Sequence, residues 1–154
     1  MYITVHSAAG AALGQFIPSA PLAFAIGFCS HIILDMIPHG DEWIKTWKIF
    51  KTQMQRTVAA SFIDFIGVII MSVYWINYSS ISDLPYLLSG IAGAIAPDAL
   101  WGLYELTKTP ILSWYRKFHT FAHHAIFKKE LSFSKGLLIQ LPILIICTWI
   151  ISKF

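Results

Sequence analysis

Charged residues are scarce in this sequence: Asp, Glu, Lys and Arg make up 12% of its 154 residues, against about a quarter in a typical soluble domain. Hydrophobic residues make up 56%, and the mean hydropathy is +0.65. So little charge argues against an ordinary water-soluble enzyme. The length fits a single membrane-embedded domain, residues 1–154, with four or five membrane-length helices and short connections between them.

Cysteine is nearly absent as well. The sequence has two cysteines, Cys29 and Cys147, and each lies inside an apolar stretch. This argues against a disulfide framework and against a zinc site made of thiolates. A large excess of one charge is also missing, because the net charge is only +3 and is spread along the chain. Nucleic acid is therefore not an expected partner.

What the sequence has instead is a series of long apolar stretches. They cover residues 5–17, 19–37, 58–77, 84–106 and 133–152. The first makes a helix of about 20 Å, which is short for a span, so it is either a short inner helix or a re-entrant one. Its Gly10 and Gly14 form a GxxxG face, which lets another helix approach closely. We expect an all-α, polytopic integral membrane bundle.

Two further segments have the composition of helices at the membrane surface. In residues 43–54, large apolar side chains recur at helical spacing and lysines fall away from that stripe. The stripe consists of Trp43, Trp47, Phe50 and Met54. Residues 109–128 mix aromatic residues with basic residues and three histidines. We expect both segments to form interfacial amphipathic helices.

Basic residues predict the orientation of the bundle. Lys and Arg gather in residues 38–57 and 107–135, whereas the turn at residues 78–83 has none. Since cytoplasmic loops carry the excess of Lys and Arg, both basic segments should face the cytoplasm. The chain is thus expected to be a multi-pass protein of the cell membrane.

The six histidines lie in three short stretches that this topology brings to the same membrane face. Asp35, Asp64 and Asp98 lie within the spans or at their cytoplasmic ends. An aspartate inside a span is disfavoured by roughly 2.5 to 3.5 kcal/mol and is normally kept for a partner or a function. The three spans that carry these aspartates contain no Lys or Arg, which leaves histidines or a bound cation as partners.

Imidazole and carboxylate are a usual ligand set for zinc and related divalent metals. His31 with Asp35, and His119 with His123, stand four residues apart, so each pair shares one helix face, as in H-E-x-x-H helices. The sequence therefore predicts a metal site at the cytoplasmic face. Its candidate ligands are His6, His31, Asp35, His39, Asp98, His119, His123 and His124.

Several candidates also have a structural explanation that the sequence leaves open. His31 and Asp35 could form a helix-to-helix hydrogen bond, and Asp64 a polar contact with nearby Ser and Thr. Asp98 follows a proline and could cap the second half of an interrupted helix. His124 could simply face solvent. The joint pattern favours metal binding over these explanations taken one by one.

Four stretches of the chain resemble a known family. They are Val5-His6-Ser7, Ser30-His31-Ile32-Ile33-Leu34-Asp35-Met36-Ile37-Pro38-His39-Gly40-Asp41, Ala96-Pro97-Asp98 and Phe118-His119-Thr120-Phe121-Ala122-His123-His124. They look like the small membrane-bound metal-dependent hydrolases that are distantly similar to zinc-dependent phospholipase C. The resemblance implies a hydrolase that uses one to three divalent ions, with zinc as the expected metal, on a lipid-like phosphoester.

The leading functional hypothesis is a hydrolase that cleaves a phosphoester at the cytoplasmic leaflet with a metal-activated water. Asp41 or Asp64 is the expected general base, and Arg116 and Lys117 are expected to hold the phosphate. An alternative is a membrane protein that binds or transports metal ions without hydrolysis. A third hypothesis is an assembly protein whose helices are held together by metal.

Overall fold

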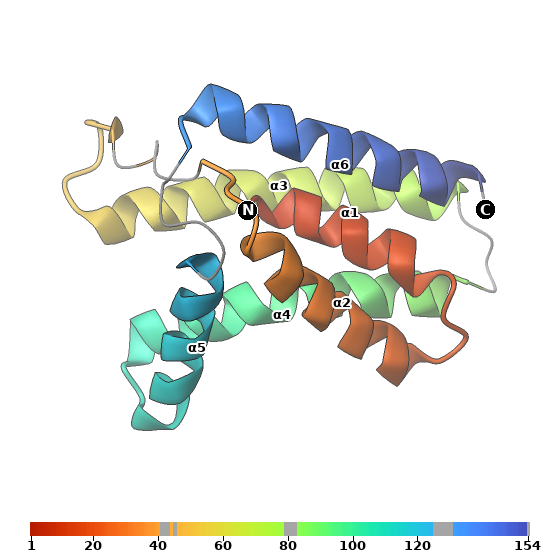
Figure 1. Ribbon diagram of the computed structural model, residues 1–154, viewed down its shortest axis with the longest axis horizontal. Helices are drawn as coiled ribbons and strands as arrows, with labels where there is room; N and C mark the ends of the chain where they lie inside the picture. Colours follow the sequence, from red (N-terminus) through yellow and green to blue (C-terminus); the bar gives the residue numbers. More distant parts are fainter. Residues whose placement is uncertain (41–43, 45, 79–82, 125–130, 154) are drawn as a thin grey trace.

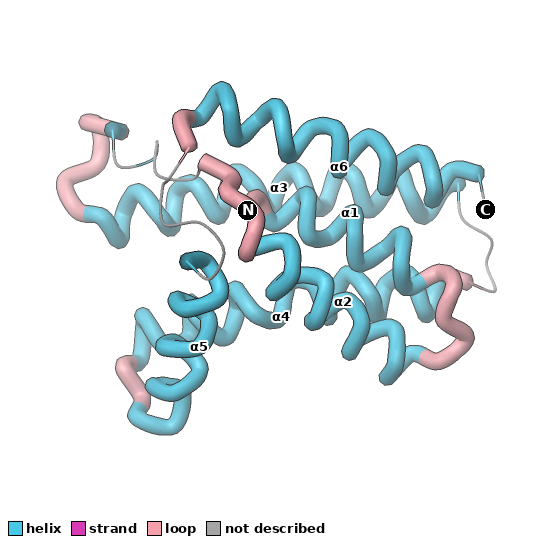
Figure 2. The backbone as a smooth tube through the Cα atoms, viewed as in Figure 1, coloured by secondary structure: helices cyan, strands magenta, loops and turns pink. Residues whose placement is uncertain are grey.

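The computed structural model describes residues 1–40, 44, 46–78, 83–124 and 131–153, and these are almost entirely helical (Figures 1 and 2). The helices are α1 (Ile3–Gly14), α2 (Ala20–Asp35), α3 (Gln53–Tyr78), α4 (Leu84–Thr107), the 3-10 turn η2 (Pro110–Leu112), α5 (Ser113–His124) and α6 (Phe133–Lys153). The described residues contain no strand. The prediction of an all-α fold is therefore confirmed.

Helix α1 is the centre of the bundle, and most of its residues are buried. It packs against α2, α3, α4 and α6. Its small residues make this possible, because a Cβ added at Gly10 would lie 2.3 Å from the carbonyl oxygen of Gly90 on α4, and one at Gly14 would lie 2.5 Å from that of Tyr86. The close helix approach predicted from the GxxxG face is confirmed. The first apolar stretch is an inner helix.

Three helices, α3, α4 and α6, are long and apolar enough to cross a membrane. With a rise of about 1.5 Å per residue, 26-residue α3 is about 39 Å long, and 16-residue α2 is about 24 Å long against a hydrocarbon core of about 30 Å. Three helices, rather than four or five, thus have the length of a span in the described chain. Their outer faces expose large apolar side chains such as Ile70 and Ile145, as expected for a membrane protein.

The prediction of a surface helix over residues 43–54 is wrong for the part that the structure describes. Residues 46–52 contain turns and no α-helix, and α3 begins directly after them. The reason is a capping box: the Thr52 hydroxyl oxygen accepts a hydrogen bond from the backbone N–H of Gln55, and the Gln55 side-chain oxygen accepts one from the N–H of Thr52. A helix start at this point divides the apolar stripe between a turn and α3.

The other expected interfacial helix is present in part. Helix α5 occupies the middle of residues 109–128 and is strongly amphipathic, while residues 125–130 lie outside the described chain. The interrupted helix considered for Asp98 is also corrected, because α4 continues through Pro97. Asp98 is therefore inside a helix and is not an N-cap.

One end of the bundle collects the described helix ends that flank the two segments predicted to be cytoplasmic. The carboxyl ends of α2 and α4, the amino ends of α3 and α6, and α5 lie together there (Figure 1). Lys51, Lys108, Arg116 and Lys135 belong to these ends. The carboxyl end of α3 and the amino end of α4 lie at the opposite end, and the sequence between these two helices has no basic residue.

Candidate metal centre

Asp35 is the residue on which the site is built. It is the last residue of α2, and its side chain is 1% exposed. Three imidazole Nε2 atoms surround its Oδ2: His123 at 2.9 Å, His31 at 3.0 Å and His119 at 3.6 Å. Two of these histidines come from α5 and one from α2, so separate parts of the chain converge on one carboxylate oxygen.

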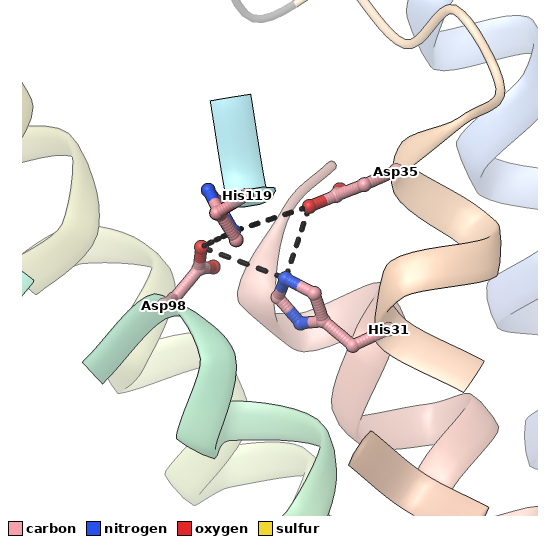
Figure 3. Close-up of side chains that lie close together, drawn as sticks. All are labelled: His31, Asp35, Asp98 and His119. Carbon is pink, nitrogen blue, oxygen red and sulfur yellow. Dashed lines mark ion pairs between the residues drawn. The ribbon is translucent and has the colours of Figure 1, made fainter. Parts of the chain in front are cut away.

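Asp98 completes this arrangement from α4 (Figure 3). Its Oδ1 lies 3.4 Å from Nε2 of His119 and 3.6 Å from Nε2 of His31. His31, Asp35, Asp98 and His119 each direct one donor atom into a space where these atoms lie within 4.8 Å of one another. Such a spacing fits a single ion bound among them.

A second group of possible ligands shares the same aspartate. Asp35, His39 and His123 also place one donor atom each within 4.8 Å of one another. The turn after α2 supplies His39, which is buried. Two groups that share one carboxylate are the arrangement expected where a carboxylate bridges two cations.

Hydrogen bonds on the far side of two rings determine which nitrogen is available. Nδ1 of His31 donates to the carbonyl oxygen of Ala94 over 2.7 Å, and Nδ1 of His39 donates to that of Ile37 over 2.6 Å. Because a carbonyl oxygen only accepts, the proton of each neutral ring lies on Nδ1, and Nε2 carries a lone pair. This backbone hydrogen bond is the usual way in which a metal-binding histidine is oriented.

The donor atoms at the centre lack hydrogen-bond partners. Within the described chain, Nε2 of His31, Nε2 of His119 and Oδ2 of Asp35 are buried without one. Unpartnered buried polar atoms are rare and call for an explanation, and here a lone pair of His31 faces a carboxylate oxygen at 3.0 Å. A single proton added to one ring nitrogen would turn only one of these contacts into a hydrogen bond. A cation satisfies all three atoms, so the residues fit a metal ion.

His6 holds a different position from the other histidines. Its Nε2 lies 3.0 Å from Oδ1 of Asp35, on the opposite side of the carboxylate. Its ring stacks on that of His31 with the centroids 3.7 Å apart. The amino group of Met1 lies 2.8 Å from the same oxygen. His6 belongs to neither ligand group and instead orients Asp35 and His31.

Helix α5 carries His119 and His123 one turn apart, both directed at Asp35. The Tyr115 hydroxyl, one turn earlier, donates to the Pro97 carbonyl oxygen over 3.0 Å and anchors α5 on α4. Burial raises the pKa of Tyr115, so the hydroxyl stays protonated. Burial also lowers the pKa of His123, although Asp35 opposes this, and the neutral ring is the form that binds metal. The side chain of His124, the last residue of α5, lies outside the described part of the structure.

Gln140 on α6 is a functional candidate that sequence reasoning missed. This 2% exposed amide donates from Nε2 to the His39 carbonyl oxygen over 2.6 Å and accepts the backbone N–H of Tyr2 over 2.8 Å. Nearby, a Cβ on Gly136 would lie 2.1 Å from the same His39 oxygen. Helix α6 therefore positions the turn that carries His39. The sequence feature that could have identified Gln140 is a single amide side chain within an apolar span.

Asp64 on α3 lines the cavity described below, but its hydrogen-bond partners differ from those of Asp35. Its carboxylate accepts hydrogen bonds from the backbone N–H groups of Ile3 and Thr4 and from the Thr4 hydroxyl. These donors begin α1, so Asp64 caps that helix from α3. The geometry agrees with the structural alternative considered for this residue, and its role as general base stays a prediction.

The remaining predicted residues lie outside the cluster. Arg116 and Lys117 are exposed on α5, and Nε of Arg116 lies 3.5 Å from a Glu105 carboxylate oxygen. Neither basic residue lines the cavity described below. Asp41 falls among the residues that the structure does not describe. The phosphate-binding and base roles given to these residues stay predictions.

A cavity of about 790 Å³ opens beside the cluster. His39, Asp98, His119 and His123 line one side, and apolar side chains of α3 and α4 line much of the rest. Its volume lies in the range of about 300 to 1,000 Å³ that is typical of small-molecule sites. Four of the candidate ligands thus line a cavity that is large enough for a substrate, whereas His31 and Asp35 lie behind them and are buried.

Comparisons of the chain with protein-family models, with curated proteins and with solved structures each found no match. The site is therefore interpreted from its own chemistry.

Proposed function

We propose that this protein is an integral membrane, metal-dependent hydrolase that cleaves a lipid-like phosphoester at the cytoplasmic leaflet. The observation that carries the proposal is the convergence of imidazole and carboxylate groups around Asp35. Among them, Nε2 of His31, Nε2 of His119 and Oδ2 of Asp35 are buried without a hydrogen-bond partner in the described chain. The neighbouring cavity has the size of a substrate site. A cluster of metal-binding side chains next to a cavity of this size supports a function in which a bound cation acts on a bound substrate.

The proposed ligands form two groups joined at Asp35. His31, Asp98 and His119 complete one group, and His39 and His123 complete the other. Imidazole nitrogen and carboxylate oxygen suit zinc better than magnesium or calcium, which prefer oxygen alone. When bound, a divalent cation lowers the pKa of a coordinated water and polarises the phosphoryl oxygen.

The residues of the chain perform the remaining tasks of hydrolysis. The water oxygen forms a bond to phosphorus, the bond from phosphorus to the leaving oxygen breaks, and a proton passes from the water to a carboxylate and from there to the leaving oxygen. Asp64 and Asp98 both line the cavity, but the Asp64 oxygens accept hydrogen bonds from the start of α1. Asp98 directs Oδ1 toward His31 and His119, so its Oδ2 is the carboxylate oxygen that accepts this proton. Arg116 and Lys117, on the exposed side of α5, attract an anionic substrate to this end of the bundle.

The proposed orientation follows from the basic residues that share an end with the cluster. Loops rich in Lys and Arg remain in the cytoplasm. A substrate therefore comes from the inner leaflet.

The test measures metal content and hydrolysis on the purified protein. We expect stoichiometric zinc, hydrolysis of at least one member of a phospholipid and lipid-phosphate panel, loss of turnover on chelation and recovery when zinc is returned. Stoichiometric zinc without hydrolysis of any panel member counts against the proposal. Zinc uptake into proteoliposomes without hydrolysis supports the alternative, a metal transporter.

A further inference from the structure

Helices α3 and α4 follow one another in the chain, yet in the described residues no extensive packed interface joins them. Helix α3 packs against α1 and α6, and α4 packs against α1, α2 and α5. The cavity beside the metal cluster lies between α3 and α4, with residues of both helices in its walls. Two neighbouring helices of membrane-spanning length are thus separated at the end that carries the site.

The cavity walls are continuous helix faces. On α3 the lining includes Met54, Val58, Phe62 and Phe65, which recur at spacings of three and four residues, and the smaller polar residues Thr57 and Ser61 share this mainly apolar face. Phe62 is 66% exposed. Among the described helices none covers this face, and α3 is one of the helices that can cross a membrane. The face is therefore suited to contact hydrocarbon.

The facing wall on α4 combines apolar and ligand residues. Ile95, Asp98, Gly102 and Leu106 lie on one face of the helix and line the cavity. Asp98 stands nine residues before the end of α4, which places it about 14 Å along the helix from that end. The metal ligands are therefore reached from within the length of a membrane helix, through a gap with apolar walls.

We propose that the gap between α3 and α4 receives the hydrocarbon chain of a membrane phospholipid directly from the bilayer, with its phosphoester beside Asp98 and His119. The part of this proposal that concerns the phosphoester rests on the function proposed above. The apolar walls bind the chain, and the continuity of the cavity with the ligand cluster positions the ester. The gap then selects amphiphiles over water-soluble phosphoesters.

Gly102 offers a way to close the gap. A Cβ added there meets nothing within 4 Å, although the residue lines the cavity. Gly102→Phe therefore fills the space without a backbone clash, and replacing glycine inside a helix also favours the helical state. Leu103→Phe is the matched control, because Leu103 is the next residue, is 48% exposed and does not line the cavity.

The first experiment locates the chain without relying on catalysis. The full-length protein is reconstituted in phosphatidylglycerol vesicles that carry a photoactivatable diazirine on one acyl chain, and crosslinked residues are mapped by mass spectrometry. We expect crosslinks at Val58, Phe62 and Leu106, reduced about tenfold in Gly102→Phe, which corresponds to the loss of about two buried methylene contacts. The yield should be unchanged in Leu103→Phe. Equal yields in both variants, or crosslinks only on outer positions such as Ile70, would overturn the proposal.

The second experiment separates the chain site from the hydrolase. Turnover is compared on phosphatidylglycerol vesicles and on bis(p-nitrophenyl) phosphate, which has no acyl chain. Gly102→Phe should lower the ratio of lipid to soluble turnover about tenfold, while Leu103→Phe leaves it unchanged. If wild-type protein hydrolyses neither compound but the crosslinks map to the gap, the hydrolase proposal fails and the chain site stands. If hydrolysis occurs and the ratio does not change, the chain site fails and the hydrolase stands.

Discussion

Asp35 on α2 and Asp64 on α3 both place a carboxylate in contact with the first residues of the chain. The groups that surround the two carboxylates are opposite in kind. Asp64 is surrounded by donors, because backbone N–H groups and a hydroxyl at the start of α1 point at its oxygens. Asp35 has an oxygen without a hydrogen-bond partner, facing imidazole nitrogens. The same residue type thus caps a helix at one position, where donors offset its burial, and belongs at the other to two groups of residues that could hold a metal ion.

The largest expected effect is at Asp35. Asp35→Asn keeps the shape of the side chain but removes the anionic oxygen that both ligand groups share, so metal affinity should fall by more than about a hundredfold and turnover should disappear. Asp83→Asn, at the opposite end of the molecule, is the control and should retain both. Metal content after dialysis and circular dichroism of the helices provide the measurement. Full occupancy in Asp35→Asn would remove the distinction between the two aspartates.

His119→Gln tests whether α5 supplies a ligand to the same metal site as α2. Gln keeps a hydrogen-bonding group but loses the imidazole Nε2 atom, which lies 3.4 Å from Oδ1 of Asp98 and 3.6 Å from Oδ2 of Asp35. We expect metal affinity to fall by about a hundredfold, measured by competition with a fluorescent chelator. Thr120→Ser, on the next residue, is the control. An unchanged affinity would exclude His119 from the ligands.

A smaller effect is expected at Gln140, which acts through the position of His39. Gln140→Leu preserves the volume but removes the hydrogen bond to the His39 carbonyl, so metal affinity should fall by about tenfold while the stoichiometry is retained. Gln140→Glu keeps an acceptor for Tyr2 but sets a carboxylate oxygen against the His39 carbonyl oxygen, so it should lose at least as much thermal stability as Gln140→Leu. A melting temperature that falls in Gln140→Leu without any change in metal affinity would show that Gln140 supports the fold alone.

The smallest effect on metal is expected at Asp64. Asp64→Ala leaves the first N–H groups of α1 without their acceptor, which should destabilise the protein by about 1 to 3 kcal/mol with no change in metal content. Asp64→Asn, which keeps one acceptor oxygen, should fall between Asp64→Ala and wild type. Thermal unfolding and metal content are measured on both variants. Loss of metal from a folded Asp64→Asn protein would make Asp64 part of the site after all.

Local features of the sequence explain the predictions that were confirmed. The all-α fold follows from long apolar stretches, and the tight contact of α1 with α4 follows from Gly10 and Gly14. Both are properties of a few neighbouring residues. The surface helix over residues 43–54 failed for an equally local reason, since Thr52 and Gln55 form a helix start within the apolar stripe. Two local signals competed there, and the hydrogen-bonded cap decided where α3 begins.

The order of the amino acids is enough to show which residues are polar, which segments are apolar helices and which pairs, such as His31 with Asp35, share a helix face. The contacts that those polar residues make depend on how the helices pack. Gln140 reaches His39 across 101 residues, and Asp64 reaches Thr4 across 60. Spacing along a helix says which face a side chain occupies but not which other helix meets that face. The donors around Asp64 and their lack at one oxygen of Asp35 follow from the way α1 packs among its neighbours.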